Sequence, residues 1–425
     1  MPEYLKRAEP QPESATRELR DTVSEMLLAV ERGGVDAVRR YSERLDGWNP
    51  DSFRVPAEEV ERATASIDDE LRTHIDFARE QIVRFAGLQR ESMTGFERET
   101  LPGVVLGQRH IPVNAVGSYS PGGRYPMLAS SLMTVAVPKV AGSARVVACA
   151  PPREGGGIHP PQLYAMASAG ADEILCFGGV QALAALAYGI DDLEPVDMIV
   201  GAGNAYVAEA KRQLFGTVGI DLLAGPTEIL VIADDDADPE LVAADLLGQA
   251  EHGPTSPAAL VTTSHEFGEA TAAAVEAWLP SWPTADPAAG AWRDFGSIVV
   301  CEDDEEVVRV ADAFAPEHLE VQTRDPDWFL ERLTNYGSLF LGRDATVAYG
   351  DKAIGTNHVL PTSGAARYTG GLWVGKFLKT VTYQRVDQRG TQAVAPAAAA
   401  ICDAEFMQGH AITCRLRLDG MPAAR

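Results

Sequence analysis

The sequence predicts an α/β fold with two parallel-sheet units. Short apolar runs of strand length alternate with stretches of helical periodicity, which is the pattern of parallel strands joined by crossover helices. The alternation runs from Tyr119 onward and starts again after Gly225 and Pro226. A length of 425 residues with 46% hydrophobic content is enough for two or more domains with buried cores, and it excludes a disordered chain.

The region before Tyr119 is predicted to be helical first and extended afterwards. Apolar residues at helical spacing, interrupted at Gly33 and Gly34, predict helices over 13–32, 35–45 and 58–85. Apolar residues set among turn residues then predict strands over 103–116.

The first α/β unit is predicted between residues 118 and 225. Its buried strands are expected at 146–150, 173–177 and 197–200, and its helices at 128–141, 161–169 and 182–188. The second unit is predicted to join residues 1–117 to residues 226–370. Its strands are expected at 228–233, 259–262, 297–301, 319–322 and 338–341, and its helices at 239–250 and 267–278.

Two further segments are predicted to lack regular structure. The Pro/Ala-rich stretch 280–290 is expected to be an exposed loop, and the low-complexity run 394–400 is expected to be a linker. The turn-rich segment 364–371 separates a C-terminal tail, 371–425, from the second unit.

The charge balance excludes several classes of partner. The chain has 61 Asp and Glu against 36 Lys and Arg, a net charge of −25, which repels nucleic acid and anionic membranes. The sequence has no apolar run long enough to span a bilayer and no secretory signal at its start. Five scattered cysteines indicate reduced thiols. We therefore expect a cytoplasmic protein without nucleic acid or membrane partners.

Gln249 and His252 lie three positions apart at the end of a predicted helix, so both side chains can leave from one face. Gly253 and Pro254 end the helix and leave that face open. An oxygen and an imidazole donor at this spacing suit half of a divalent metal site. The alternative is a polar helix end at which the histidine caps the last carbonyls.

Glu317 and His318 are adjacent in a predicted loop, where they can flank a substrate from two sides. Imidazole titrates near neutrality, and burial can raise a carboxyl group toward the same range, so the pair suits two separate proton transfers. The alternative is a loop histidine packed against Phe314. Asp351 and His358 share one glycine-flanked loop that allows close backbone approach to a ligand, or that is a solvated turn.

Three glycine-containing loops follow predicted strands, at 119–123, 178–181 and 201–204. Open parallel sheets bind ligands at the carboxyl ends of their strands. The last of these loops precedes a helix, so its N–H groups can bind a dinucleotide phosphate. Tyr206 stands where the full dinucleotide fingerprint has its third glycine, so this motif is weak on its own.

Taken together, these segments resemble the histidinol dehydrogenase family from about residue 20 to about residue 415. The motifs occur in the family's order: Tyr119-Ser-Pro-Gly-Gly, Gly178-Gly-Val-Gln, Gly201-Ala-Gly-Asn, Gly225-Pro-Thr-Glu, Gln249-Ala-Glu-His-Gly, Ala315-Pro-Glu-His-Leu, Gly350-Asp, Gly355-Thr-Asn-His-Val-Leu-Pro-Thr and Glu405 to His410. Such a collinear set is specific, and it favours the functional interpretation over the alternatives above.

The resemblance implies a homodimer that uses NAD to oxidise a primary alcohol, through a retained aldehyde, to a carboxylate. It implies two Rossmann-like, incompletely doubly wound domains and a small C-terminal helical tail that reaches the partner subunit. One zinc ion per subunit would be held by Gln249, His252 and Asp351, together with His410 of the partner subunit.

The resemblance also assigns roles by motif. Glu317 and His318 would be the acid/base residues, and NAD would lie near Tyr119, Gln181 and Asn204. The substrate would be contacted by Thr227, Gln249, His252, His318, Asp351, His358, Glu405 and His410.

Departures from the biosynthetic pattern bear on the substrate. Thr227 and Ala202 stand where Ser and Pro are usual. The stretches 110–117, 325–330, 336–342 and 365–374 are similar to the sulfopropanediol 3-dehydrogenase branch, which oxidises 2,3-dihydroxypropane-1-sulfonate to sulfolactate. An anionic substrate needs a cationic partner, and Arg367 is a candidate. The oxidation of histidinol to histidine is the alternative. A non-catalytic zinc- or NAD-binding paralogue is a further one, and the presence of Glu317 and His318 argues against it.

The acidic, lysine-poor composition predicts a halophilic protein, because concentrated salt screens the self-repulsion of the surface charges. We expect the thermal unfolding midpoint to rise when the salt concentration goes from millimolar to molar. Calorimetry in both conditions measures this, and a protein that loses no stability on desalting would count against a halophilic host.

Overall fold

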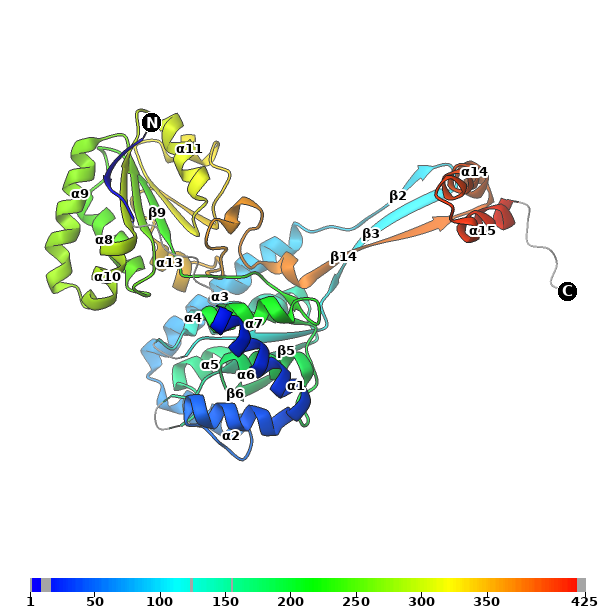
Figure 1. Ribbon diagram of the computed structural model, residues 1–425, viewed down its shortest axis with the longest axis horizontal. Coiled ribbons are helices and arrows are strands. Elements are labelled where there is room, and N and C mark those ends of the chain that lie inside the picture. The colour runs from blue at the N-terminus through cyan, green and yellow to red at the C-terminus, as the bar shows by residue number, and fades with distance from the viewer. Residues whose placement is uncertain (1, 9–16, 123–124, 154–155, 419–425) are drawn as a thin grey trace.

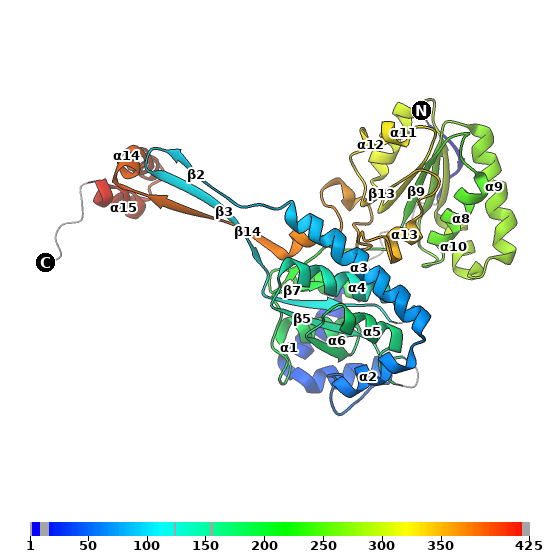
Figure 2. The same cartoon turned by 180° about the vertical axis from the view of Figure 1, so that it is seen from behind.

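The computed structural model describes residues 2–8, 17–122, 125–153 and 156–418, and it shows two α/β lobes and a long arm (Figures 1 and 2). The predicted α/β class with parallel sheets is confirmed. Among the described residues, none of the helices combines the length and apolar character that crossing a bilayer requires.

The first lobe is built on a five-stranded parallel sheet of order β6-β5-β4-β7-β8. Its elements are β4 (Ala115–Tyr119), α4 (Leu128–Ala141), β5 (Arg145–Ala150), α5 (Pro160–Ser168), β6 (Glu173–Cys176), α6 (Gly179–Tyr188), β7 (Met198–Val200), α7 (Ala205–Leu214) and β8 (Gly219–Ile220). Each face of the sheet packs on its own apolar cluster, so helices cover both faces.

The N-terminal helices belong to this first lobe, which differs from the expected grouping of residues 1–117 with 226–370. They are α1 (Arg17–Asp46), which is kinked at Gly34, α2 (Ala57–Ser66) and α3 (Asp69–Glu91). Helix α1 packs against α6 and α7, where Val23 and Leu27 share a core with Leu183 and Leu186. Helix α3 packs against α4 on the other face. The apolar stripe of an amphipathic helix can pack on any exposed apolar sheet face, so the sequence of the helix does not identify the sheet that it covers.

The second lobe has a six-stranded sheet of order β1-β11-β10-β9-β12-β13, parallel except for the edge strand β1 (Glu3–Lys6). Its other elements are β9 (Ile229–Ala233), α8 (Pro239–Ala250), β10 (Ala258–Thr262), α9 (His265–Trp278), η1 (Leu279–Ser281), α10 (Ala285–Phe295), β11 (Gly296–Val300), α11 (Asp304–Phe314), β12 (His318–Gln322), α12 (Pro326–Leu330), β13 (Ser338–Leu341), α13 (Val347–Lys352) and η2 (Ala365–Arg367). Of the described residues before 118, β1 is the part that joins this sheet.

The arm is an antiparallel sheet of order β14-β3-β2 that leaves the first lobe and ends in two helices (Figures 1 and 2). Its elements are β2 (Phe96–Leu101), β3 (Val104–Pro112), η3 (Val374–Phe377), β14 (Leu378–Val386), α14 (Gln388–Ala404) and α15 (Gln408–Leu418). The predicted tail therefore starts inside the first lobe, where Leu372, Val374 and Phe377 are buried, and then pairs with β3.

Two predicted irregular segments are helical instead. The expected loop 280–290 runs into α10, because Ala288, Ala291 and Trp292 form one buried face and Pro287 lies in the first turn, which tolerates proline. The expected linker 394–400 lies within α14, since alanine is the strongest helix former and outweighs the single Pro396.

Candidate active site

The amino edge of the second sheet brings together two segments that are far apart in sequence. Strands β9 and β12 are parallel neighbours in which His318 is opposite Ile229. Thr227 and Glu228 come just before β9, and Glu317 comes just before β12. These residues and His318 therefore lie side by side. The predicted loop position of His318 is wrong, since it is the first residue of β12.

Glu317 is buried and held from two sides. Its Oε2 accepts a hydrogen bond from the Glu228 backbone N–H at 3.0 Å and another from the Thr227 hydroxyl. Burial raises the pKa of Glu317 to about 7, against the opposing effects of His318 and of these donors. A carboxyl group with a pKa in this range can both accept and release a proton near neutrality.

The His318 ring is fixed at one nitrogen and left open at the other. Its Nδ1 lies 3.0 Å from the Glu228 carbonyl oxygen, which assigns the ring proton to Nδ1. Its buried Nε2 lies 3.3 Å from Asp351 Oδ1 and has no hydrogen-bond partner among the described residues. Burial lowers the pKa of His318, but the carboxylates of Glu317 and Asp351 outweigh it and raise the value to about 9. An orphaned ring nitrogen in a buried site is available to a ligand.

Three of the predicted zinc ligands line one cavity of about 550 Å³, which we call the active-site cavity. Gln249 is in the last turn of α8 and His252 lies just beyond it, while Asp351 comes from α13. The start of α4 and the residues before it, Tyr125 to Ala129, form the facing wall. Gln249, His252 and Asp351 therefore converge as predicted. The cavity that they line lies between the two lobes.

The donor set fits a zinc ion. Among the described residues, no group of three or more His, Cys, Asp or Glu side chains is arranged to hold a metal. The candidate set contains two of those residue types, His252 and Asp351, and adds the Gln249 amide. Burial lowers the pKa of His252, so its imidazole is neutral, and the close approach of His318 outweighs burial and keeps Asp351 ionised by lowering its pKa. Neutral imidazole, carboxylate and amide oxygen are all ligands that zinc accepts.

His358 anchors the 355–362 loop to the first lobe. Its Nε2 lies 2.6 Å from the Ser130 hydroxyl on α4. Burial lowers the pKa of His358 to about 4, so the ring is neutral. His358 is absent from the residues that line the active-site cavity, although it is close enough for the charge of Asp351 to act on its pKa.

Glu405 and His410 lie at the far end of the arm, in and beside α14 and α15, and both are exposed (Figure 1). The structure does not bring them to the cavity of their own chain, in which Gln249, His252 and Asp351 lie.

The three residues predicted to contact NAD gather at the carboxyl edge of the first sheet. Tyr119 ends β4, Gln181 lies in the first turn of α6 after β6, and Asn204 caps α7 after β7. Tyr119 and Gln181 are buried, with the Tyr119 hydroxyl accepting from the Gly179 N–H at 3.3 Å. Asn204 is exposed, so it is the one of the three that faces solvent. Gly123 of the first motif lies outside the described residues.

A buried ion pair holds the loop at 201–204. Lys211 and Asp221, with side chains 3% and 0% exposed, pair with each other and bind Gly201 from both sides. Lys211 donates to the Gly201 carbonyl, and the Gly201 N–H donates to Asp221, both at 2.8 Å. Gly201 has φ 118°, and a Cβ there would overlap the Tyr119 carbonyl, so only glycine fits. The pair therefore fixes the backbone of this loop.

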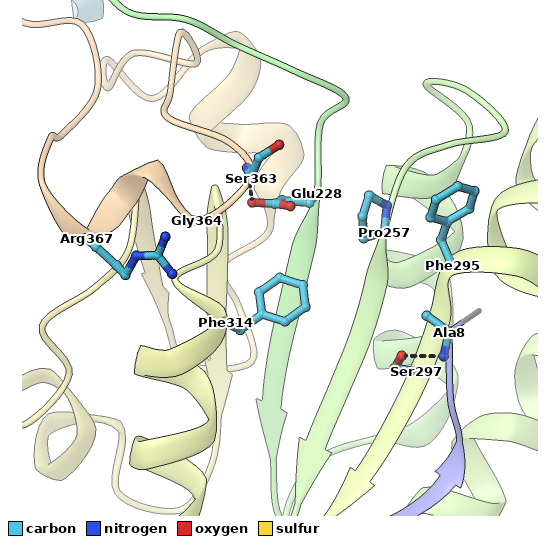
Figure 3. Close-up of a pocket in the computed structure, with 9 residues that line it drawn as sticks. All are labelled: Ala8, Glu228, Pro257, Phe295, Ser297, Phe314, Ser363, Gly364 and Arg367. Atoms are coloured by element: carbon cyan, nitrogen blue, oxygen red, sulfur yellow. Dashed lines mark hydrogen bonds between the residues drawn. The ribbon is translucent and has the colours of Figure 1, made fainter. Parts of the chain in front are cut away.

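Arg367 lies apart from the predicted metal ligands. It lines a second, smaller cavity of about 360 Å³ with Glu228, Phe314 and Ser363 (Figure 3). The Ser363 N–H donates to Glu228 Oε1 at 3.0 Å there. The prediction that Arg367 is the cationic partner of an anionic substrate is not supported by this placement, because the predicted metal ligands line the other cavity.

Two residues of the site were missed. The backbone N–H of Glu228 donates to Glu317, and its carbonyl oxygen accepts from His318. These contacts follow from the strand register and not from the side chain of Glu228. Lys352 lines the active-site cavity beside Asp351, and its place next to that residue in the sequence was the available signal.

Comparison with known proteins shows which family this chain resembles over its length. The family model described as histidinol dehydrogenase matches residues 9–418. A histidinol dehydrogenase homolog from Shouchella clausii is 52% identical over 98% of this chain and 99% of its own, and the sulfopropanediol 3-dehydrogenase of Ruegeria pomeroyi is 47% identical over 98% and 96%. The crystal structure of histidinol dehydrogenase from Elizabethkingia anophelis matches with a TM-score of 0.91 and 33% identity, over 97% of this chain and 94% of that one.

Proposed function

The chain belongs to the histidinol dehydrogenase family, and from that premise we propose that it oxidises a small primary alcohol, through a bound aldehyde, to a carboxylate with NAD and zinc. The preferred substrate in this proposal is 2,3-dihydroxypropane-1-sulfonate, with sulfolactate as the product. The observation that carries the proposal is the buried pair Glu317 and His318. His318 contacts Asp351, and Asp351 lines the active-site cavity.

The zinc site in the proposal consists of Gln249, His252 and Asp351, with His410 of the partner subunit as the fourth ligand. Zinc bound there supplies positioning and polarisation of the alcohol oxygen. The Gln249 amide nitrogen donates to Thr227 at 2.5 Å, so the amide oxygen is the atom that remains for a metal. Thr227 thereby links the metal side of the site to Glu317.

His318 and Glu317 divide the proton transfers in this proposal. With Nδ1 held by the Glu228 carbonyl, Nε2 is the atom that exchanges a proton with the alcohol. Glu317 accepts a proton from the water that adds to the aldehyde. NAD accepts one hydride in each oxidation, so the sequence consumes two NAD and one water and releases three protons. Glu317 and His318 are both buried, and a buried site keeps bulk water away from a reactive aldehyde.

NAD binding at the first lobe is supported by its topology. Numbered by order in the chain, the strands run 3-2-1-4-5, which is the order of the first five strands in doubly wound dinucleotide-binding sheets. Such sheets bind ligands where the strand order reverses, and β4 and β7 flank that point. Tyr119 and Asn204 follow these two strands.

A homodimer with shared sites is the proposed assembly. The arm carries α14 and α15 away from both lobes (Figure 2). Large apolar residues of these helices and of the turn between them are exposed, with Phe406 at 89%, Ile401 at 58% and Ile412 at 52%. Exposed apolar side chains in a cluster mark an interaction surface. A second copy of the chain that receives this tail would bring Glu405 and His410 to its cavity.

The substrate assignment has one competing candidate, L-histidinol. The family description and the solved structure from Elizabethkingia anophelis favour it, while the relative from Ruegeria pomeroyi favours the sulfonate. We expect NADH to form at least tenfold faster from 2,3-dihydroxypropane-1-sulfonate than from histidinol, measured by absorbance side by side with the zinc-loaded enzyme in high salt. A preference for histidinol would replace the first assignment with the second, and no turnover of either would favour the non-catalytic paralogue.

Glu317→Gln removes the base that activates water and keeps the side-chain volume. We expect oxidation of the aldehyde to slow by about 10²- to 10⁴-fold, and oxidation of the alcohol to slow much less. Single-turnover NADH formation from the alcohol and from the separately supplied aldehyde measures the two steps. Equal slowing of both steps would contradict the role in water activation.

His410→Ala tests whether the tail completes the zinc site. We expect weaker zinc binding, of about 10- to 100-fold as typical for lost metal-site support, by metal analysis after dialysis. Mixing His410→Ala chains with Asp351→Asn chains should restore about a quarter of the activity, because one of the two sites in each mixed dimer is then intact. Unchanged zinc content in the single variant would remove His410 from the ligand set.

A further inference from the structure

The active-site cavity has one lysine and no arginine among the described residues that line it. That lysine is Lys352, the last residue of α13, and its side chain is 51% exposed. Its Nζ lies 3.5 Å from Asp351 Oδ2. At that distance and exposure the pair is weak, so Lys352 is not committed to Asp351.

Three carboxyl groups line the same cavity, and each of them has partners elsewhere. Asp245 accepts from Thr346 at 3.1 Å and from Gln322 at 2.9 Å. Glu251 accepts from Thr284 at 2.8 Å. Asp351 lies between His318 and Lys352. Burial also raises the pKa of Asp245, which weakens its negative charge. Each of these three carboxyl groups is therefore held by donors of the protein, of which those to Asp245 and Glu251 are uncharged.

Lys352 is left with unbalanced charge once Asp351 binds a divalent cation. Within the described part of the chain, the ammonium group of Lys352 donates a hydrogen bond to Asp351 and forms an ion pair with it. Two cations beside one carboxylate repel each other unless an anion lies close to them. An anionic group on the substrate satisfies both charges, whereas a substrate ammonium adds a third cation to the same wall.

We propose that Lys352 is the specificity-determining residue that binds the anionic head group of a short-chain alcohol and disfavours a cationic alcohol. The sulfonate of the proposed substrate has this chemistry, and the ammonium group of histidinol does not. This inference rests on the proposed function and names the residue that selects its substrate. Arg367, the other cation considered for this role, lines the second cavity together with Glu228 (Figure 3).

The test compares Lys352→Gln with the wild type as zinc-loaded, full-length enzymes. Substrates are 2,3-dihydroxypropane-1-sulfonate and glycerol, which replaces the sulfonate by a neutral hydroxyl. We expect the ratio of their kcat/KM values to fall by about 10- to 100-fold, mainly through KM, because the head group is remote from the reacting carbon. Lys352→Arg keeps the charge and should keep most of the preference.

A second readout needs no turnover. Calorimetric binding of sulfolactate to the zinc-loaded, NAD-free protein should weaken by a similar factor in Lys352→Gln, with zinc content equal to that of the wild type. Arg367→Gln removes a positive charge from the other cavity and is the matched control, with binding expected at the wild-type level. If Lys352→Gln loses zinc, a measurement on the wild type replaces the calorimetry of this variant. Bound sulfolactate should then protect Lys352 from reductive methylation, and mass spectrometry measures the modification.

The outcomes separate this inference from the proposed function. A wild type that oxidises the sulfonate, with Lys352→Gln unchanged in both readouts or Lys352 unprotected, overturns the role of Lys352 and leaves the function standing. A wild type that prefers histidinol overturns both.

Discussion

The parallel register of β9 and β12 is the constraint on which the candidate site depends. It sets the Glu228 main chain against Glu317 and His318, so that one peptide segment donates to the carboxylate and accepts from the imidazole. Because these bonds use backbone atoms, they fix both side chains without a further charged group. His318 then aims its second nitrogen at Asp351, and that contact joins the acid/base pair to the residues that suit a metal.

The cavity lies where opposite edges of the two sheets meet. The lining residues at the end of α8 lie at the amino edge of the second sheet, and those at the start of α4 come from the carboxyl edge of the first. The bond between His358 and Ser130 ties the two lobes together beside the cavity. One lobe thus contributes the edge at which parallel sheets bind ligands, and the other contributes acid/base and metal-type groups.

Much of the fold and of the site could be predicted from sequence, because strand–helix alternation and ordered motifs are local. The bounds of α4 and α8 agree with the prediction, and Gln249, His252 and Asp351 do meet. The destination of the N-terminal helices could not be predicted, since either sheet accepts an apolar stripe. Glu228 was missed because its contacts with Glu317 and His318 are made by its backbone. Arg367 was misplaced because proximity in the sequence of a loop does not decide which side of a strand a side chain reaches.

The arm has a consequence for how the protein is made. Strand β3 pairs along its whole length with β14, which is synthesised after the strands of both lobes, so the hairpin of β2 and β3 must wait for its third strand. Pairings of such long sequence separation are slow to form, and unpaired strand edges are prone to aggregate. The strands of both lobes are therefore made while the β2–β3 hairpin still has an unpaired edge. The interval before β14 is synthesised is thus the period in which this protein is most prone to aggregate.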